Sequence, residues 1–303
     1  MAMHGASKES PIATSLLGAS RFSSLCGVVL LTGLLVCIGC AWGSTMFLST
    51  RDSDIKDSTK AIETARDDAQ RAKSYSSRGA AYSEKARYSR LSKLISDDEY
   101  GRLFDLAIKD HDQAVALNPA SAEVYFNRAQ TYYDRGSLDL IYVTNPFEGK
   151  PRNNTWLHAA ALDFEKATEK DPKNSLAFDM LGLTYQSNGE ADQAIRAYTQ
   201  EMALDRRLGK LRLADVYCIV GYEQQLQKNL DRAVAAYEKS IEFGVADDKS
   251  CPIEPFETMT AIYATETREY DKAWDMVRRA QKAGRRIASD VIDRLKKDSA
   301  HPN

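Results

Sequence analysis

Five alanines recur along this chain at similar intervals, and they constrain its fold more than any other feature. Successive members are 53, 34, 39 and 40 residues apart. They are Ala107, Ala160, Ala194, Ala233 and Ala273. Small residues let two helices approach closely, and the aromatic residues near each alanine can fill the space between helix pairs. A repeat of this length predicts stacked helical hairpins.

The segment around Ala194 shows the pattern of one hairpin in full. Gly189 provides a turn, and Ala194 and Tyr198 mark a second helix. The residues that mark one face of a first helix are Phe178, Leu181, Gly182 and Tyr185. This segment resembles the tetratricopeptide repeat family, a helix–turn–helix unit with a period of 34 residues. It departs from the family at Glu201, where a small residue is usual.

Four other segments repeat parts of the same pattern, beginning near Tyr75, Tyr125, Tyr217 and Phe256. The resemblance implies an all-α fold over residues 74–284. That fold is a right-handed superhelix of about five hairpins of the tetratricopeptide type. An apolar stripe that includes Ile287 and Leu295 predicts a capping helix within residues 285–303.

Two insertions interrupt the repeat. Ala160 follows Gly136 by 24 residues, and the Pro, Gly and Asn content of residues 137–159 predicts a loop. Both a functional loop and neutral drift at a tolerant position remain open for this insertion. Residues 87–97 are polar and compatible with a helix, so the extra residues there are expected to lengthen the two flanking helices.

The N-terminal part of the chain is apolar. No charged residue lies between Arg21 and Arg51, and residues 26–48 are long enough to cross a bilayer as a helix. The sequence therefore predicts a single-pass membrane protein, with the repeats on the periplasmic or outer side. A cleaved signal peptide and a lipoprotein anchored at Cys40 are the alternatives. The expected segments are a tail over 1–21, a transmembrane anchor or signal sequence over 22–50, and a helical linker over 51–73.

The chain carries no motif for catalysis. Its four histidines are not paired at a metal-ligand spacing, and it has no glycine-rich phosphate loop or nucleophile elbow. We therefore expect no enzyme activity, no metal and no cofactor. Only Cys218 and Cys251 lie beyond the apolar segment, either as one disulfide or as two free thiols, and we favour free thiols.

In the tetratricopeptide family the first helices line a concave groove, and the resemblance places the binding residues there. The residues that match the groove positions are Phe126, Gln130, Tyr133, Asp134, Asp179, Leu183, Gln186, Tyr222 and Gln225. The alternative for their aromatic members is packing against a neighbouring hairpin or against the inserted loop. The paired basic residues with which some family members bind carboxylate ends are absent, apart from the loose candidates Lys73 and Asn127. The acidic and aromatic lining favours a neutral or basic partner.

These features predict a membrane-anchored scaffold that binds a partner peptide or helix and assembles an envelope or membrane complex. The alternative is a secreted or periplasmic solute- or glycan-associated module that uses the 137–159 insertion, with an enzymatic role included. Lys and Arg number 41 against 43 Asp and Glu, which gives a net charge of −2. This balance offers no basic face for nucleic acid. Self-association is left open.

Overall fold

A computed structural model of the chain describes residues 46–143, 155–244, 251 and 253–300. The chain divides into two compact units, Met1–Ser53 and Asp54–Asn303. In the first unit the described residues, 46–53, are helical. In the second unit every regular element within the described ranges is a helix. The all-helical fold predicted from the repeats is therefore confirmed.

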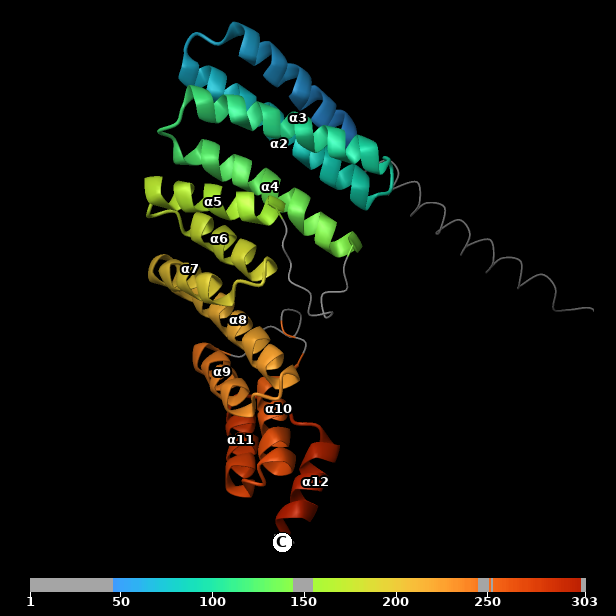
Figure 1. The fold of residues 1–303 in the computed structure, drawn as a ribbon, viewed down its shortest axis with the longest axis vertical. Helices are drawn as coiled ribbons and strands as arrows, with labels where there is room; N and C mark the ends of the chain where they lie inside the picture. Colours follow the sequence, from blue (N-terminus) through green and yellow to red (C-terminus); the bar gives the residue numbers. More distant parts are fainter. Residues whose placement is uncertain (1–45, 144–154, 245–250, 252, 301–303) are drawn as a thin grey trace, which may run out of the picture. The chain divides into compact units, whose positions relative to one another are not determined.

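The second unit consists of antiparallel hairpins that follow one another in chain order (Figure 1). Each hairpin packs on the next through its second helix. The first three are α2 (Asp68–Leu91) with α3 (Asp97–Leu117), α4 (Ala122–Val143) with α5 (Thr155–Lys170), and α6 (Ser175–Ser187) with α7 (Ala191–Leu204). The first helices of neighbouring hairpins also contact each other, α2 with α4 and α4 with α6. These helices thus contact helices of their own hairpin and of the neighbouring hairpin, as in other helical repeat folds.

The last two hairpins complete the stack. They are α8 (Arg206–Leu226) with α9 (Leu230–Phe243), and α10 (Pro255–Ala261) with α11 (Tyr270–Lys282). A π-helical turn, η1 (Ile262–Glu266), continues α10. The final helix, α12 (Ser289–Ala300), contacts both α10 and α11 and buries Leu295 completely.

Side chains at the helix ends explain where several helices begin and end. The Asn174 side chain accepts a hydrogen bond from the backbone N–H of Ala177 at the start of α6. Asp205 does the same for α8, and it alone separates α8 from α7. Both are residue types that cap helix N-termini well. Between α6 and α7, Gly189 adopts a φ of +79°, which glycine reaches without strain.

The core of the hairpins contains a repeated contact between a side-chain ring of one helix and a small residue of the other. In three hairpins a glycine of the first helix lies under a buried ring of the second helix. The pairs are Gly79 with His111, Gly182 with Tyr198, and Gly221 with Tyr237. In the second hairpin, Ala129 and Phe164 belong to the same buried cluster. Small residues and rings at this spacing were the signal that predicted the hairpins.

Two segments differ from their sequence-based description. Residues 137–159 were expected to form a loop, yet α4 runs to Val143 and α5 starts at Thr155. Residues 144–154 lie outside the described part of the chain. The expected linker, 51–73, is divided between a helix over residues 46–64 and the first turns of α2. Thr59, in the part of this helix that belongs to the second unit, accepts a hydrogen bond of 3.1 Å from Arg78 of α2.

The predicted membrane location is wrong. Across the residues that the structure describes, no helix is both long and apolar enough to cross a membrane. Residues 46–50 of the expected anchor, 22–50, begin a helix that continues through Asp52, Asp54 and Lys56. Charges at this frequency are costly in a bilayer core. The rest of the expected anchor lies outside the described residues.

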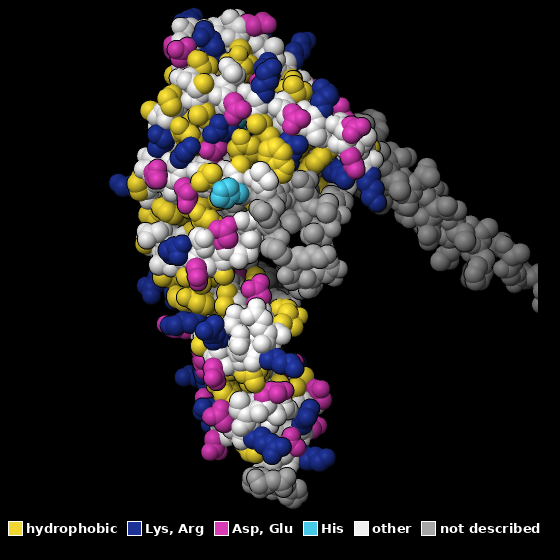
Figure 2. All heavy atoms as spheres, viewed as in Figure 1, with side chains coloured by type: hydrophobic (Ala, Val, Ile, Leu, Met, Phe, Trp, Pro, Cys, Tyr) yellow, Lys and Arg dark blue, Asp and Glu magenta, His cyan; other side chains and the backbone are white. Residues whose placement is uncertain are grey.

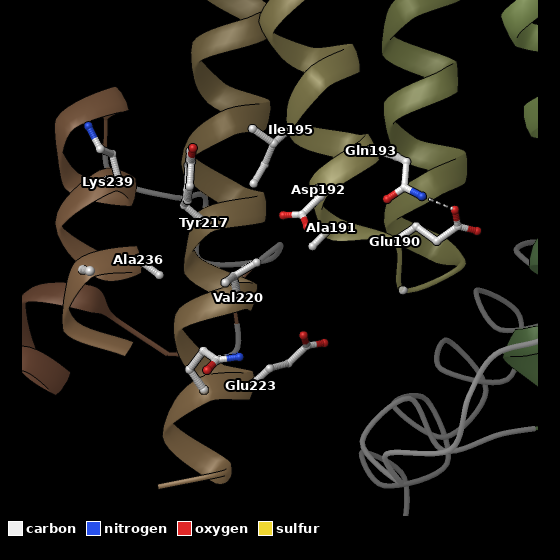
Figure 3. A pocket seen from close by; sticks show the side chains of 13 residues that line it. Glu190, Ala191, Asp192, Gln193, Ile195, Tyr217, Val220, Glu223, Ala236 and Lys239 are labelled. Atoms are coloured by element: carbon white, nitrogen blue, oxygen red, sulfur yellow. Dashed lines mark hydrogen bonds between the residues drawn. The ribbon is translucent and has the colours of Figure 1, made fainter. Parts of the chain in front are cut away.

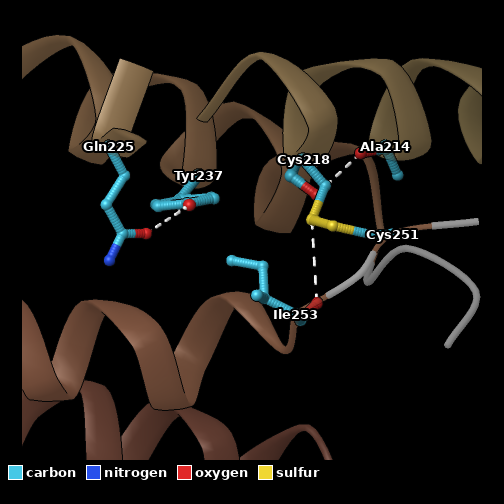
Figure 4. The surroundings of a disulfide bond; sticks show 7 residues. Ala214, Cys218, Gln225, Tyr237, Cys251 and Ile253 are labelled. Atoms are coloured by element: carbon cyan, nitrogen blue, oxygen red, sulfur yellow. Dashed lines mark hydrogen bonds between the residues drawn. A yellow bond between two sulfur atoms is a disulfide. The ribbon is translucent and has the colours of Figure 1, made fainter. Parts of the chain in front are cut away.

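The expectation of two free thiols is also wrong, because Cys218 and Cys251 form a disulfide (Figure 4). Their Cα atoms are 6.0 Å apart, and both residues are buried. The bond joins α8 to the segment just before α10, within the largest buried cluster of the last two hairpins. The cysteines are 33 residues apart in sequence, and only the fold shows that they meet.

Candidate binding surface

The first helices α2, α4, α6, α8 and α10 together form what we call the first-helix face. The structure places every predicted groove residue on one of three of these helices. Phe126, Gln130, Tyr133 and Asp134 belong to α4, Asp179, Leu183 and Gln186 to α6, and Tyr222 and Gln225 to α8. Their contacts divide them into residues that stabilise the fold and residues that remain available to contact a partner.

Phe126 and Tyr133, the two predicted aromatic groove residues of α4, both contribute to packing. Phe126 meets Phe164 of α5 edge-to-face, with ring centroids 5.5 Å apart. The Tyr133 side chain is half-buried and hydrogen-bonds Ser187 of α6, and burial raises its pKa above the ordinary value of 10.0. Tyr133 therefore contacts a neighbouring hairpin, as in the packing alternative, whereas the ring contact of Phe126 lies within its own hairpin.

Two of the three predicted glutamines, Gln186 and Gln225, have a role that the sequence pattern did not indicate. The buried hydroxyl of Tyr198 donates to Gln186 Oε1 at 2.9 Å, and that of Tyr237 donates to Gln225 Oε1 at 2.8 Å. Each bond satisfies a polar atom inside a hairpin. Figure 4 shows the amide nitrogen of Gln225 pointing away from Tyr237. A signal for this bond exists in the sequence, since each glutamine stands twelve residues before its tyrosine.

Asp179 already forms an ion pair within the fold. Arg212 of α8 donates to both of its carboxylate oxygens, at 2.6 and 3.2 Å, and Asp179 is buried. Next to this pair lies Glu201 of α7, which is fully buried, and neither of its carboxyl oxygens has a hydrogen-bond partner among the described residues. Burial raises the pKa of Glu201 to about 8, Asp179 adds to the increase and Arg212 opposes it. This cluster joins α6, α7 and α8 rather than facing a partner.

A polar cavity of about 210 Å³ lies between α2 and α4. Two predicted residues, Gln130 and Asp134, are part of its lining. Asp134 is buried and accepts a hydrogen bond of 3.2 Å from Gln130. Burial raises the pKa of the Asp134 carboxyl, Arg87 and the Gln130 hydrogen bond counteract this, and Glu84 adds to it. Gln130 and Asp134 are therefore predicted groove residues that help to line a cavity.

A larger hollow, of about 720 Å³, lies elsewhere (Figure 3). Its lining comes from α7, α8 and α9 and contains none of the predicted groove residues. Apolar side chains such as Ile195 and Val220 line it. Its charged lining residues are Glu190, Asp192, Glu223 and Lys239. Because two of its three helices are second helices, this hollow is not a part of the first-helix face.

The charged and titratable side chains of the described helices are spread over the surface or buried within the fold. Figure 2 shows acidic and basic side chains interspersed along the visible face of the described helices. In the described ranges, no group of three or more His, Cys, Asp or Glu side chains could hold a metal ion. His111 is fully buried, and burial lowers its pKa to about 3. It therefore stays neutral at physiological pH and acts as a packing residue.

Comparison with known families identifies the class of repeat. Two models described as tetratricopeptide repeat match residues 164–196 and 214–243. The chain therefore contains tetratricopeptide repeats, as the spacing of its small and aromatic residues predicted. Helical repeats of this class offer a surface for partners and are usually not catalytic. No curated protein matches the chain.

Solved structures resemble the chain only loosely. A crystal structure of MamA is 18% identical over 64% of this chain and 89% of its own, with a TM-score of 0.38. A human IFIT1 dimer with m7Gppp-AAAA is 16% identical over 74% of this chain and 48% of its own, with a TM-score of 0.42. TTC0263, a thermophilic TPR protein from Thermus thermophilus, is 18% identical over 66% and 94%, with a TM-score of 0.33. Scores this low carry no argument about function, and the expectation that no nucleic acid binds stays a prediction.

Proposed function

We propose that this protein is a protein–protein interaction scaffold that binds an extended segment or a helix of its partner on the first-helix face. Residues 74–284 would form the repeat domain, with residues 285–303 as its cap. One observation carries the proposal: the available side chains of two consecutive first helices, α6 and α8, combine apolar contact with hydrogen-bonding groups. Such a mixture suits recognition of a peptide, in which side chains and backbone must both be satisfied.

The available groups follow one another from helix to helix. Leu183 of α6 and Tyr222 of α8 are half-buried, and Leu226 near the end of α8 is 60% exposed. The amides of Gln186 and Gln225 are held in place by tyrosine hydroxyls that occupy their oxygens. Each amide nitrogen can then donate to a backbone carbonyl of a bound segment. Side chains fixed in this way lose little freedom on binding.

The test uses residues whose removal leaves the hairpin cores intact. Changing Leu183→Gln and Tyr222→Ala together should weaken partner binding by at least about tenfold, because both lose apolar contact area. Phe126 and Tyr133 are poorer choices, since they pack between helices. Binding can be measured by calorimetry, with the partner obtained by affinity capture with the full chain.

A matched control comes from the second helices. Leu162 of α5 and Leu204 of α7 are 48% and 43% exposed, so Leu162→Gln and Leu204→Gln change comparable surface away from the proposed site. These variants should bind the partner with the same affinity as the unchanged protein. Equal loss in both sets, or loss only in the control set, would show that the partner does not use the first-helix face.

A further inference from the structure

The third and fourth hairpins each present one amide donor group that the fold itself does not use. The hydroxyl of the fully buried Tyr198 occupies the side-chain oxygen of Gln186. In the next hairpin, the hydroxyl of Tyr237 occupies that of Gln225. Neither amide nitrogen has a hydrogen bond with any residue that the structure describes. Both glutamines are half-buried on the first-helix face, so their N–H groups are available to a partner.

Among the first four hairpins, a glutamine stands at this position only where the buried ring carries a hydroxyl. Gln186 and Gln225 each follow the glycine of their own first helix by four residues. In the first and second hairpins, where the ring belongs to a histidine or a phenylalanine, the same position holds Ser83 and Tyr133. Any acceptor would satisfy a buried hydroxyl, whereas an amide also carries N–H donors. The hydroxyl therefore fixes which edge of the amide, the donor edge, is directed to the partner.

The same pair of groups recurs on both helices. Leu183 stands three residues before Gln186, and Tyr222 stands three residues before Gln225, so each apolar side chain is a neighbour of its amide on the helix surface. A donor that is repeated from hairpin to hairpin calls for an acceptor that is repeated along the partner. Backbone carbonyls are such a group, because every residue has one.

The free carbonyls must belong to an extended segment. Within a helix, each backbone carbonyl already accepts a hydrogen bond from the N–H group four residues further along. In an unpaired extended segment, the carbonyl and N–H groups have no partners until they bind. Main-chain hydrogen bonds of this kind supply affinity, and pockets for the side chains supply specificity.

We infer that the third and fourth hairpins bind the main chain of an extended partner segment, with Gln186 and Gln225 each donating to one of its backbone carbonyls. The inference rests on the proposed function and decides between the two partner conformations that it allows. It excludes a helix at this part of the face. Selectivity for the partner would then come from its side chains that contact Leu183 and Tyr222.

The probe is a peptide selected from a random 12-residue library with the purified full chain. Each backbone amide of the selected peptide is replaced in turn by an ester, which weakens the carbonyl as an acceptor and leaves every side chain unchanged. Two of these replacements should each reduce affinity by about three- to tenfold, the effect of one hydrogen bond. A lactam bridge that holds the same peptide in a helix should abolish binding. Calorimetry measures all of these affinities.

Two variants assign the carbonyls to their donors. Gln186→Glu and Gln225→Glu keep an oxygen for the tyrosine hydroxyl and remove the N–H donors, so the fold should be retained while affinity falls by about tenfold. In each variant, one of the two ester effects should disappear. Gln200→Glu adds the same charge at an exposed position of α7 and should leave the affinity and both ester effects unchanged.

The outcomes separate this inference from the proposed function. If Leu183→Gln with Tyr222→Ala abolishes peptide binding, but both ester effects persist in the two glutamate variants, the main-chain inference is wrong and the scaffold stands. The same holds if no ester lowers affinity for the unchanged protein, a measurement that needs no variant to fold, or if the helical peptide binds as tightly as the linear one. If no peptide is selected, both proposals fail. Far-UV circular dichroism checks the fold of each variant.

Discussion

Gly182 and Tyr198 illustrate how single residues determine the geometry of a hairpin. A Cβ atom at Gly182 would lie 2.2 Å from the ring of Tyr198, and one at Gly221 would lie 2.4 Å from the ring of Tyr237. Atoms in a folded core do not approach so closely. The absent side chain is therefore what allows the second helix to place its ring against the first.

We expect Gly182→Ala to destabilise the protein by about 1–3 kcal/mol, because overpacking displaces a buried ring. Gly101 is the matched control: it lies inside α3, and nothing comes within 4 Å of the place that an alanine methyl group would take there. Gly101→Ala should stabilise the protein by up to about 1 kcal/mol through helix propensity. Urea unfolding followed by circular dichroism measures both, and equal effects would contradict the packing argument.

Glu201 gives the protein a dependence on pH. Its pKa rises from 4.5 to about 8 on folding, so the folded state binds a proton that the unfolded state releases above pH 4.5. Stability from this residue is complete below pH 4.5 and is lost as the pH rises to about 8. The charged groups that face it are Asp179 on α6, Arg212 on α8 and Asp205 between α7 and α8.

Glu201→Gln should therefore stabilise the protein by about 2 kcal/mol above about pH 8, where the buried carboxylate is charged, and by much less at about pH 4.5. Thermal unfolding across this range measures the difference. Glu169→Gln, at an exposed glutamate of α5, should give a constant difference near zero. A Glu201→Gln effect that does not change with pH would mean that the carboxyl titrates normally.

The roles of some of these residues could be predicted from the sequence, and the roles of others could not. The glycines and rings were visible because their spacing repeats along the chain. Glu201 was visible only as a departure from the family pattern, since its burial depends on α8 crossing over it. The predicted groove role of Gln186 missed its bond to Tyr198, because a family position indicates which face a residue occupies and not what it touches there.

At the scale of elements, ion pairs join consecutive helices, both within a hairpin and between neighbouring hairpins. Arg128 of α4 donates to both carboxylate oxygens of Asp163 on α5, at 2.6 and 2.9 Å, and to Asp112 on α3 at 2.7 Å. Asp163 is buried. Arg78 and Asp110 form an equivalent bidentate ion pair between α2 and α3. Such pairs fix the angle between helices through geometry as well as charge.

Arg128→Ala should destabilise the protein by about 3 kcal/mol, because it leaves the Asp163 carboxylate buried and unpaired. Arg102 provides the control, since it forms a pair of similar shape with Glu99 but is 60% exposed. Arg102→Ala should cost far less than Arg128→Ala, because solvent screens an exposed ion pair. Comparable losses in the two variants, measured by urea unfolding, would show that burial of the pair is unimportant.

Insertions were the hardest elements to place from the sequence. The prediction that the extra residues around 87–97 lengthen both helices agrees with α2 ending at Leu91 and α3 starting at Asp97. The prediction for 137–159 was wrong at both ends, because Pro, Gly and Asn in its middle say nothing about how far the flanking helices extend. In the last hairpin Ala273 follows Tyr263 by ten residues, whereas Ala194 follows Tyr185 by nine in the third hairpin. The structure has a π-helical turn, η1, in this part of the last hairpin. A π turn widens the ring of the backbone hydrogen bond and so absorbs a residue within a helix.

At the scale of the whole repeat unit, stability follows from contacts between neighbouring hairpins. Each hairpin contacts the next in the chain, so local changes are expected to spread only to adjacent repeats. The disulfide between Cys218 and Cys251 adds a covalent link between the fourth and fifth hairpins. Closing a loop of this length typically contributes about 3–4 kcal/mol by restricting the unfolded chain.

Reduction of this bond should loosen one end of the stack and leave the other end unchanged. In hydrogen exchange followed by mass spectrometry, reductant should speed exchange in α9–α12, which depend on the link, and leave α2–α5 as they were. The variant Cys218→Ser/Cys251→Ser should show the fast pattern without reductant and should not respond to it. Faster exchange along every helix would mean that the repeats unfold as one cooperative body. No change in α9–α12 would mean that packing of α8, α9 and α10 holds the end of the stack without the disulfide.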